Sequence, residues 1–207
     1  MENLSLLATY IVNNDFSEYS KVFTEVNSRL NLLSKNEIKF LWEKHIYDSL
    51  SFKLFYEKYG KEKDTILDLG TGGGFPAIPI AIEFPQLEIT GLDSINKKIL
   101  AVREISERLG LENIDFMCDR AENIKMKKFD IITSRAVAKI DVLANYAGGL
   151  LKKGGYFVVY KSKTVEEELA SAKVILAKNG LKFIETIDYT LPLEEIYERR
   201  LVIFQKV

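Results

Sequence analysis

The feature of the sequence that most constrains the fold is the glycine-rich turn at residues 70–74, which follows a short apolar run at 65–69. The run carries one acid, Asp68, and the turn leads into an amphipathic stretch that begins at Pro76. A buried strand, a tight glycine turn and a helix in this order build the nucleotide site of an open α/β sheet, at the carboxyl ends of its strands. Glycine permits positive φ angles and a close approach of the backbone to a ligand. The stretch therefore predicts a cofactor site without deciding which cofactor it holds.

The first part of the chain is predicted to be helical. Apolar side chains recur at steps of three and four from Phe16 to Leu33, and this spacing places them on one face of a helix. The polar segment 60–64 interrupts the pattern, and a different pattern follows it. We therefore predict an N-terminal helical extension over residues 1–62 and an α/β domain over residues 63–207.

A second helix is predicted to begin at Ser34, because Ser34 and Glu37 have the spacing of a capping box, in which each side chain bonds the backbone N–H of the other residue. Trp42 and His45 are expected on the inner face of this helix, with Asp48 one turn after His45. His45 is the only histidine in the chain. We expect it to have a structural role, paired with Asp48 or with a backbone group; the alternative is that it forms a wall of the substrate cleft.

Beyond residue 63, apolar runs alternate with amphipathic stretches, the pattern of a mostly parallel sheet. Ser94 and the segment 164–167 are expected to cap two of the helices. The last two apolar runs are joined by about ten residues with no helix, so they should form an antiparallel hairpin. Five parallel strands and a terminal antiparallel hairpin match the Rossmann-like sheet of S-adenosylmethionine-dependent methyltransferases, an α/β fold. The strands are expected at residues 65–69, 87–92, 114–117, 129–133, 156–160, 183–189 and 201–204.

The glycine turn is a poor site for a diphosphate. Residues 72–77 fit the dinucleotide fingerprint G-x-G-x-x-G/A loosely, so NAD has to be considered. However, Pro76 and Pro79 fall in the first helical turn and remove N–H groups that a pyrophosphate would use. S-adenosylmethionine has no phosphate and carries a sulfonium cation, and Asp68 suits a cation better than a diphosphate. The turn therefore favours S-adenosylmethionine, with Gly70, Gly72 and Gly74 close to it.

Two further turns at the same edge carry candidate cofactor residues. Asp93 ends the second predicted strand, where a carboxylate can accept hydrogen bonds from both ribose hydroxyls. The alternative is that Asp93 only caps the next helix. The turn 118–122 follows the third strand and borders the adenine in methyltransferase sheets. There the Ala121 N–H and the Glu122 region could bind the edge of the ring, or the turn could simply be a solvated charged loop.

Composition limits the partners and the kinds of site. The net charge is −1 and the pI is about 6.0, so nucleic acid cannot be attracted by total charge and would need a local basic patch. Cys118 is the only cysteine, which rules out an internal disulfide and a multi-cysteine metal site. No apolar run approaches the ~20 residues of a membrane helix. We expect a cytoplasmic monomer with no metal and no membrane contact.

Several short motifs are distributed along the chain in a fixed order. They are Asn31-Leu32-Leu33-Ser34, Lys44-His45-Ile46-Tyr47-Asp48-Ser49, the stretch 68–79, Leu92-Asp93-Ser94, Thr133-Ser134-Arg135-Ala136-Val137-Ala138 and Glu198-Arg199-Arg200-Leu201-Val202. Taken in their order and spacing, they resemble the bacterial small-subunit ribosomal RNA guanine-N7 methyltransferases, and the resemblance covers most of the chain. Residues 160–162 depart from it, since Tyr-Lys-Ser replaces the usual Lys-Gly ending of the fifth strand.

The resemblance implies a reaction and a set of cofactor contacts. It implies methylation of N7 of a guanine in 16S ribosomal RNA, with ribosomal RNA or the small ribosomal subunit as the partner. N7 carries no proton, so its methylation needs no general base, and the protein supplies placement and electrostatics. The family's cofactor contacts carry over to Gly70, Phe75, Ala121, Glu122 and Arg135. With Asp68, Gly72, Gly74 and Asp93 they make the expected cofactor-binding set.

Basic residues gather after the predicted strands at the cofactor edge. Arg135 and Lys161 are expected to be catalytic, at the methyl-transfer site. Lys163, Arg199 and Arg200 are expected to bind the substrate RNA through its phosphates. Scattered lysines and arginines are usually solvated surface, and acids lie nearby. We nevertheless predict that this edge faces RNA.

Three other functions are compatible with parts of the sequence. The chain could methylate a small molecule or a protein, or it could be a non-catalytic RNA-binding protein of ribosome assembly that has kept the fold. It could also be an NAD-dependent oxidoreductase, against which the two prolines and the terminal hairpin argue.

Overall fold

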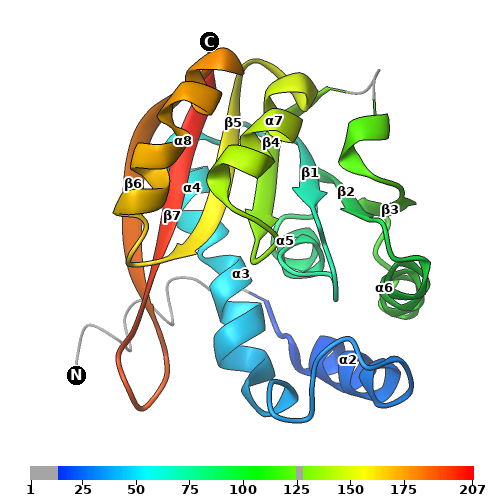
Figure 1. Ribbon diagram of the computed structural model, residues 1–207. Coiled ribbons are helices and arrows are strands. Elements are labelled where there is room, and N and C mark those ends of the chain that lie inside the picture. The colour runs from blue at the N-terminus through cyan, green and yellow to red at the C-terminus, as the bar shows by residue number, and fades with distance from the viewer. Residues whose placement is uncertain (1–13, 125–127) are drawn as a thin grey trace.

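The predicted strands pair into one seven-stranded sheet with the order β3-β2-β1-β4-β5-β7-β6 (Figure 1). The structure, a computed structural model, describes residues 14–124 and 128–207. Strands β1 to β5 pair in parallel, whereas β7 is antiparallel to both of its neighbours, as expected for a terminal hairpin. The methyltransferase-type sheet is thus confirmed. The strands are β1 (Thr65–Leu69), β2 (Glu88–Asp93), β3 (Ile114–Cys118), β4 (Phe129–Arg135), β5 (Leu151–Ser162), β6 (Leu181–Leu191) and β7 (Tyr197–Lys206).

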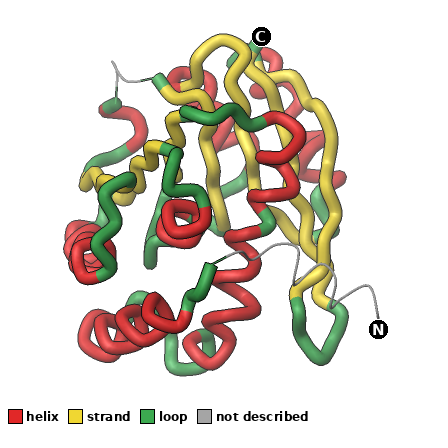
Figure 2. Tube along the Cα trace, turned by 180° about the vertical axis from the view of Figure 1, so that it is seen from behind, coloured by secondary structure: helices red, strands yellow, loops and turns green. Residues whose placement is uncertain are grey.

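Helices cover both faces of the sheet. Because side chains alternate along a strand, Ile66 and Leu67 of β1 belong to different apolar clusters on opposite faces. Helices α7 (Ile140–Leu150) and α8 (Glu166–Lys178) pack on one face, in front of the sheet in Figure 1. The other face, toward the viewer in Figure 2, is covered by α4, α5 and α6. Their bounds are α4 (Phe52–Tyr59), α5 (Ala77–Glu83) and α6 (Asn96–Arg108).

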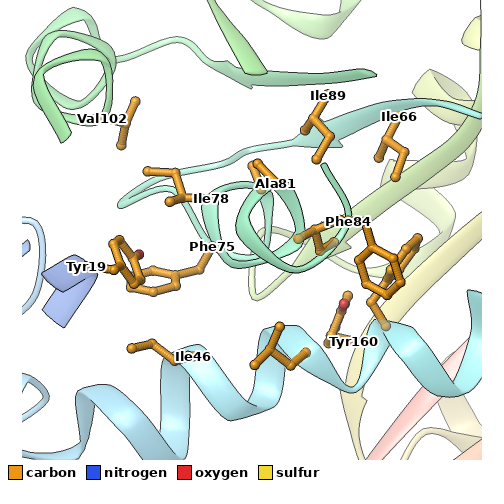
Figure 3. Close-up of a cluster of buried hydrophobic side chains, with 14 of the residues drawn as sticks. Tyr19, Ile46, Ile66, Phe75, Ile78, Ala81, Phe84, Ile89, Val102 and Tyr160 are labelled. Carbon is orange, nitrogen blue, oxygen red and sulfur yellow. The ribbon is translucent and has the colours of Figure 1, made fainter. Parts of the chain in front are cut away.

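The N-terminal segment shares its core with the sheet. Tyr19 of α2 (Ser17–Leu30) packs edge to face on Phe75 of the glycine turn, with ring centroids 6.3 Å apart. Ile46, in the helical turn Leu41–Tyr47, belongs to the same cluster of buried side chains, as Figure 3 shows. The predicted first helix and the buried face around Tyr19, Phe23 and Val26 are therefore confirmed, but the helix ends at Leu30 and does not reach Leu33. The first thirteen residues, which the predicted helical extension includes, lie outside the described residues.

The second helix differs from its prediction in form. Ser34 and Glu37 do make both capping-box bonds, each at 3.2 Å. The following residues form a 3₁₀ turn, η1 (Ile38–Phe40), and a π-helical turn, η2 (Leu41–Tyr47), before α3 (Asp48–Leu50). A π turn has a longer period than 3.6 residues, so the predicted inner face is only partly right. His45 is buried, but Trp42 is 38% exposed.

Two predicted helix caps are wrong. Within the described ranges helix α6 has no side-chain cap, and Asp93 Oδ1 instead accepts the N–H of Ile95, the residue just before the helix, at 2.9 Å. Helix α8 begins at Glu166, whose own carboxylate accepts the N–H of Val165. The expected capping box at 164–167 is therefore not formed. Among the described residues, no helix is both long and apolar enough to cross a bilayer.

Candidate functional site

The glycine turn has the conformation that its sequence predicts. The N–H groups of Gly70 and Thr71 both donate to the carbonyl of Leu92 at 2.8 Å, which ties the turn to the end of β2. Gly70 and Gly74 have φ angles of +75° and +88°, which side chains with a Cβ rarely adopt. A Cβ on Gly74 would also lie 2.5 Å from Ile78 Cδ1. Both positions therefore require glycine.

Two cavities flank this turn at the carboxyl ends of the strands. Cavity I, of about 300 Å³, lies between the ends of β2 and β3 and helix α7. Cavity II, of about 330 Å³, lies between the glycine turn, the end of β4 and the start of α6. Gly70, Asp93 and Val137 line both cavities. The other residues that matter here are Ala121, Glu122 and Tyr146 in cavity I, and Gly72, Phe75 and Arg135 in cavity II.

Val137 lines both cavities. It lies in the segment that joins β4 to α7, and a Cβ on Gly70 would be 2.4 Å from Val137 Cγ2. The preceding Ala136 has a φ angle of +55°, a strained conformation for a residue that is not glycine. The backbone here is therefore held in place by its surroundings against its own preference.

Asp93 lies at the centre of the cleft and already binds two backbone groups. Its Oδ2 accepts the N–H of Gly72 at 3.0 Å, and its Oδ1 accepts the N–H of Ile95 at 2.9 Å. Each carboxylate oxygen has a second lone pair, so these two bonds do not prevent an additional bond to a ligand hydroxyl. The alternative, that Asp93 only caps the next helix, is not supported, because the described part of the chain gives α6 no side-chain cap.

The wall of cavity I includes the predicted turn after β3 and Tyr146, which the sequence did not predict as a site residue. Ala121 and Glu122 lie in the 3₁₀ turn η3 (Ala121–Asn123). Glu122 Oε1 accepts a hydrogen bond from the hydroxyl of Tyr146 at 3.1 Å. Tyr146 comes from α7, and only the packing of that helix beside β4 brings it here.

Asp68 does not face either cavity. It is completely buried beneath the turn, and its Oδ1 accepts the hydroxyl of Thr133 at 3.0 Å. Burial raises its pKa to about 6. Asp68 is not among the described residues that line the two cavities. The expectation that it faces a cationic ligand therefore has no geometric support.

A buried ion cluster holds the other side of the cleft together. The Asp48 carboxylate, 1% exposed, binds Arg135 Nη1 and Arg199 Nε, both at 3.0 Å. The hydroxyl of Tyr189 donates to it at 2.7 Å. Burial would raise the pKa of Asp48, but the two arginines outweigh it and hold that pKa below its usual value. Asp48 is therefore an ionised carboxylate shared by two guanidinium groups.

Arg135 connects this cluster to cavity II. Its Nη1 also donates to the carbonyl of Lys44 at 2.9 Å, and its Nη2 lies 3.0 Å from His45 Nδ1. The guanidinium lies over the ring of Phe75, 5.2 Å from its centroid, in a cation–π contact. The predicted structural role of His45 is supported, but its side-chain partner is Arg135 and not Asp48.

His45 is expected to titrate far below the usual range for histidine. Burial first, and then the charge of Arg135, lowers its pKa to about 4, so Nδ1 is a neutral acceptor. In the unfolded chain the pKa is about 6.5, so the unfolded state binds more protons between pH 6.5 and 4. Stability present above pH 6.5 is therefore lost as the pH falls, by up to about 1.4 kcal/mol per pH unit.

The proton NMR signals of this single imidazole measure the pKa directly. His45→Gln, which keeps an acceptor for Arg135, should remove this part of the pH dependence of urea unfolding. A pKa near 6.5 for His45, or an unchanged pH dependence in the glutamine variant, would contradict the prediction.

The remaining basic residues of this edge are bound to acids. Lys163 pairs with Glu198 at 2.6 Å, and Arg200 binds both Asp188 and Glu166 at 2.5 Å. Their positive charge is therefore partly neutralised within the protein.

Lys161 also has partners within the protein. Its Nζ lies 2.6 Å from Glu168 Oε1 and 3.0 Å from the carbonyl of Ala138. It lines neither cavity among the described residues, so the structure does not place it as a catalytic group. Within the described ranges, no three or more His, Cys, Asp or Glu side chains are grouped as metal ligands would be.

Comparisons with known proteins give a consistent picture. The family profile described as rRNA small subunit methyltransferase G matches residues 12–191. A protein of Staphylococcus saprophyticus named ribosomal RNA small subunit methyltransferase G is 41% identical over 195 residues, which cover 92% of this chain and 80% of the relative. The protein of the same name from Bacillus subtilis is 39% identical over 197 residues, 93% of this chain and 81% of the relative.

Solved structures agree in fold. A SAM-dependent methyltransferase from Methanosarcina mazei superposes with a TM-score of 0.60 at 16% identity, over 74% of this chain and 97% of that one. M. jannaschii TYW2 in complex with AdoMet superposes with a TM-score of 0.61 at 15% identity, over 81% of this chain and 78% of that one.

Proposed function

The chain belongs to the rRNA small subunit methyltransferase G family, and we propose on that basis that it transfers a methyl group from S-adenosylmethionine to N7 of a guanine in 16S ribosomal RNA. The structural observation that supports this most is the pair of adjacent cavities that share Asp93 in their walls. Nucleoside-binding groups lie on one side of Asp93 and a guanidinium lies on the other. The two cavities lie within the range of ligand sites in proteins, about 300–1,000 Å³.

The residues of the cleft fit the parts of S-adenosylmethionine. Asp93 has free lone pairs for the ribose hydroxyls. Cavity I, with Ala121, Glu122 and Tyr146, suits the adenine, because its wall combines apolar surface with groups that can bind the ring edge. Cavity II, lined by Gly72, Phe75 and Arg135, suits the methionine portion. Gly70 and Gly74 keep the turn close to both, and the buried Asp68 links the end of β1 to Thr133 of β4.

Arg135 is the residue that we place closest to the chemistry. The cluster of Asp48, Arg135 and Arg199 carries a net positive charge, because one carboxylate is shared by two guanidinium groups and His45 is neutral. Arg135 can therefore bind a carboxylate or a phosphate at the wall of cavity II without leaving Asp48 unpaired. When bound, the cofactor supplies an electrophilic methyl group on its sulfonium. Since N7 of guanine has no proton, the protein needs to orient the base and exclude water, not to remove a proton.

The proposal extends to the organisation and partners of the chain. We propose a monomeric cytoplasmic enzyme that acts on ribosomal RNA or on the small subunit. The division into an N-terminal extension, residues 1–62, and a methyltransferase domain, residues 63–207, is part of the proposal, and Leu33 of the described part of the extension lines cavity II. Arg199 and Arg200 lie on β7, Lys163 directly follows β5, and all three contribute to RNA binding. Each of these side chains is bonded to an acidic side chain of the protein. To bind RNA, it must either exchange that acid for a phosphate or bind a phosphate while it keeps the acid.

Labelling of a purified substrate tests the proposal. Small ribosomal subunits and naked 16S RNA, both from a bacterium that lacks the modification, are incubated with this protein and methyl-labelled S-adenosylmethionine. We expect label in the RNA, and cleavage chemistry specific for N7-methylguanine should locate one site. Label confined to protein or to small molecules would support a methyltransferase with another substrate. Cofactor binding without any transfer would support a non-catalytic assembly protein.

A further inference from the structure

The segment 136–140, which joins β4 to α7, forms part of the cleft wall. Its Val137 lines both cavities, and its first residue follows Arg135 directly. One end is fixed by Arg135, through the bonds to Asp48 and to the carbonyl of Lys44. The positive φ of Ala136 shows that the backbone needs support to stay in this conformation. The question is what holds the other end.

Two side chains from other elements hold that end. Glu168 of α8 accepts the N–H of Ile140 at 2.5 Å and the ammonium of Lys161 at 2.6 Å, both with Oε1. Lys161 of β5 also donates to the carbonyl of Ala138 at 3.0 Å. The two side chains are only 16% and 23% exposed, so the pair is largely shielded from water. We call this pair, Lys161 and Glu168, the latch.

The electrostatics of the latch are favourable. Glu168 lies in the first turn of α8, and it bonds the first residue of α7. The N-terminal ends of two helices thus converge on one carboxylate, where their free N–H groups and dipoles favour a negative charge. Within the described part of the chain, the cap residue Lys139 supplies no side-chain cap for α7. Glu168 provides that bond from another helix.

We propose that Glu168 and Lys161 are positioning residues for methyl transfer, a proposal that rests on the proposed function of the cleft. They fix the segment 136–140 so that Val137 and Arg135 keep the spacing of the cleft wall. Neither residue touches the reacting atoms. Lys161 therefore acts on the backbone of the active-site segment, in place of the direct catalytic role that its position at the end of β5 suggests.

Kinetics of four variants measure the effect. Glu168→Ala and Lys161→Ala should lower kcat on the order of 10- to 100-fold, since small displacements of a catalytic wall have effects of this size. The dissociation constant of S-adenosylmethionine should change less than about threefold. The double variant should be no slower than the slower single variant, because the two side chains act as one unit. Glu167→Ala, an exposed neighbour in the same helical turn, is the control and should behave like the wild type.

Conservative variants separate positioning from a general loss of structure. Lys161→Arg keeps the charge and both donors, so it should recover most of kcat. Glu168→Gln keeps an acceptor for Ile140 but loses the charge, so its kcat should lie between those of the alanine variant and the wild type, and it replaces the alanine variant if that one does not fold. Wild-type kcat in Glu168→Ala would overturn the proposal. Additive effects of the two alanine substitutions would also overturn it, because they would give Lys161 a separate contact with the substrate.

Hydrogen exchange tests the latch without any substrate. Amides of the segment 136–143 should exchange at least about tenfold faster in Glu168→Ala than in Glu167→Ala, since a lost capping bond exposes the end of α7 to local opening. Equal exchange in the two variants would overturn the latch. If the wild type methylates no RNA, the proposed function fails, and the exchange result still decides whether the latch holds the segment.

Discussion

Replacing Asp48 with asparagine is expected to lower the free energy of unfolding by about 3–5 kcal/mol, the cost of breaking a buried ion pair. The side chain is 1% exposed and serves two guanidinium groups, so the variant leaves two buried positive charges close together without a counter-ion. Asparagine keeps the size of the side chain, so the effect reports the charge. Urea unfolding at pH 7 measures it.

The matched control is Asp115→Asn. That carboxylate is 83% exposed and lies 4.0 Å from Arg103, so its loss should change the free energy of unfolding by no more than about 0.5 kcal/mol. The pKa of Asp48 is depressed, so its contribution is present above the unfolded pKa of about 3.9 and is lost as the pH falls below it. A loss of less than 1 kcal/mol at pH 7 would show that the cluster does not hold the N-terminal segment to the sheet.

Replacing Asp93 with alanine is expected to weaken S-adenosylmethionine binding on the order of 10²- to 10⁴-fold. Two hydrogen bonds from a carboxylate to ribose hydroxyls contribute roughly 1.5–3 kcal/mol each. The structure adds a second reason, because Asp93 also binds the N–H groups of Gly72 and Ile95, so its loss loosens the turn that faces the ligand. Calorimetry with S-adenosylmethionine and with its demethylated product measures both affinities.

Asp93→Asn separates these two contributions. Asparagine keeps one carbonyl acceptor of the same size, so it should bind the cofactor more tightly than the alanine variant and less tightly than the wild type. Asp115→Ala, at an exposed position on the neighbouring strand β3, is the control and should bind normally. Unchanged affinity in Asp93→Ala would remove Asp93 from the cofactor site.

The parts of the fold that sequence reasoning predicted well depend on local signals. The strand at 65–69 was placed to the residue, because an apolar run ends there in glycines that must take positive φ angles. The terminal hairpin was right because a short link cannot make a parallel crossover. The prediction that Trp42 lies on the inner face is wrong, because a π turn changes the number of residues per helical turn. No residue type in this segment predicts a π turn.

The sequence predicts which residues lie at the candidate site, but it does not predict which side chains bind one another there. Arg135 and Arg199 were both expected to bind ligands, yet their shared contact with Asp48 joins residues 87 and 151 positions apart, which no local pattern reveals. Lys161 and Glu168 are seven positions apart, at a strand end and in the first turn of the next helix. That pairing had a signal in the sequence, since acids in a first helical turn lie close to the strand that precedes it.

The position of β7 between β5 and β6 has a consequence for synthesis of the chain. Strand β7 follows β6 in the chain and is an interior strand, so among the described strands β6 has no partner in this sheet until β7 has been synthesised. Arg199, which lies on β7, reaches Asp48 at the same time. A nascent chain can therefore form the glycine turn and Asp93 early, but it cannot complete the wall that holds Arg135. Under the proposed function, a newly made chain gains activity only after β7 has emerged and paired with β5.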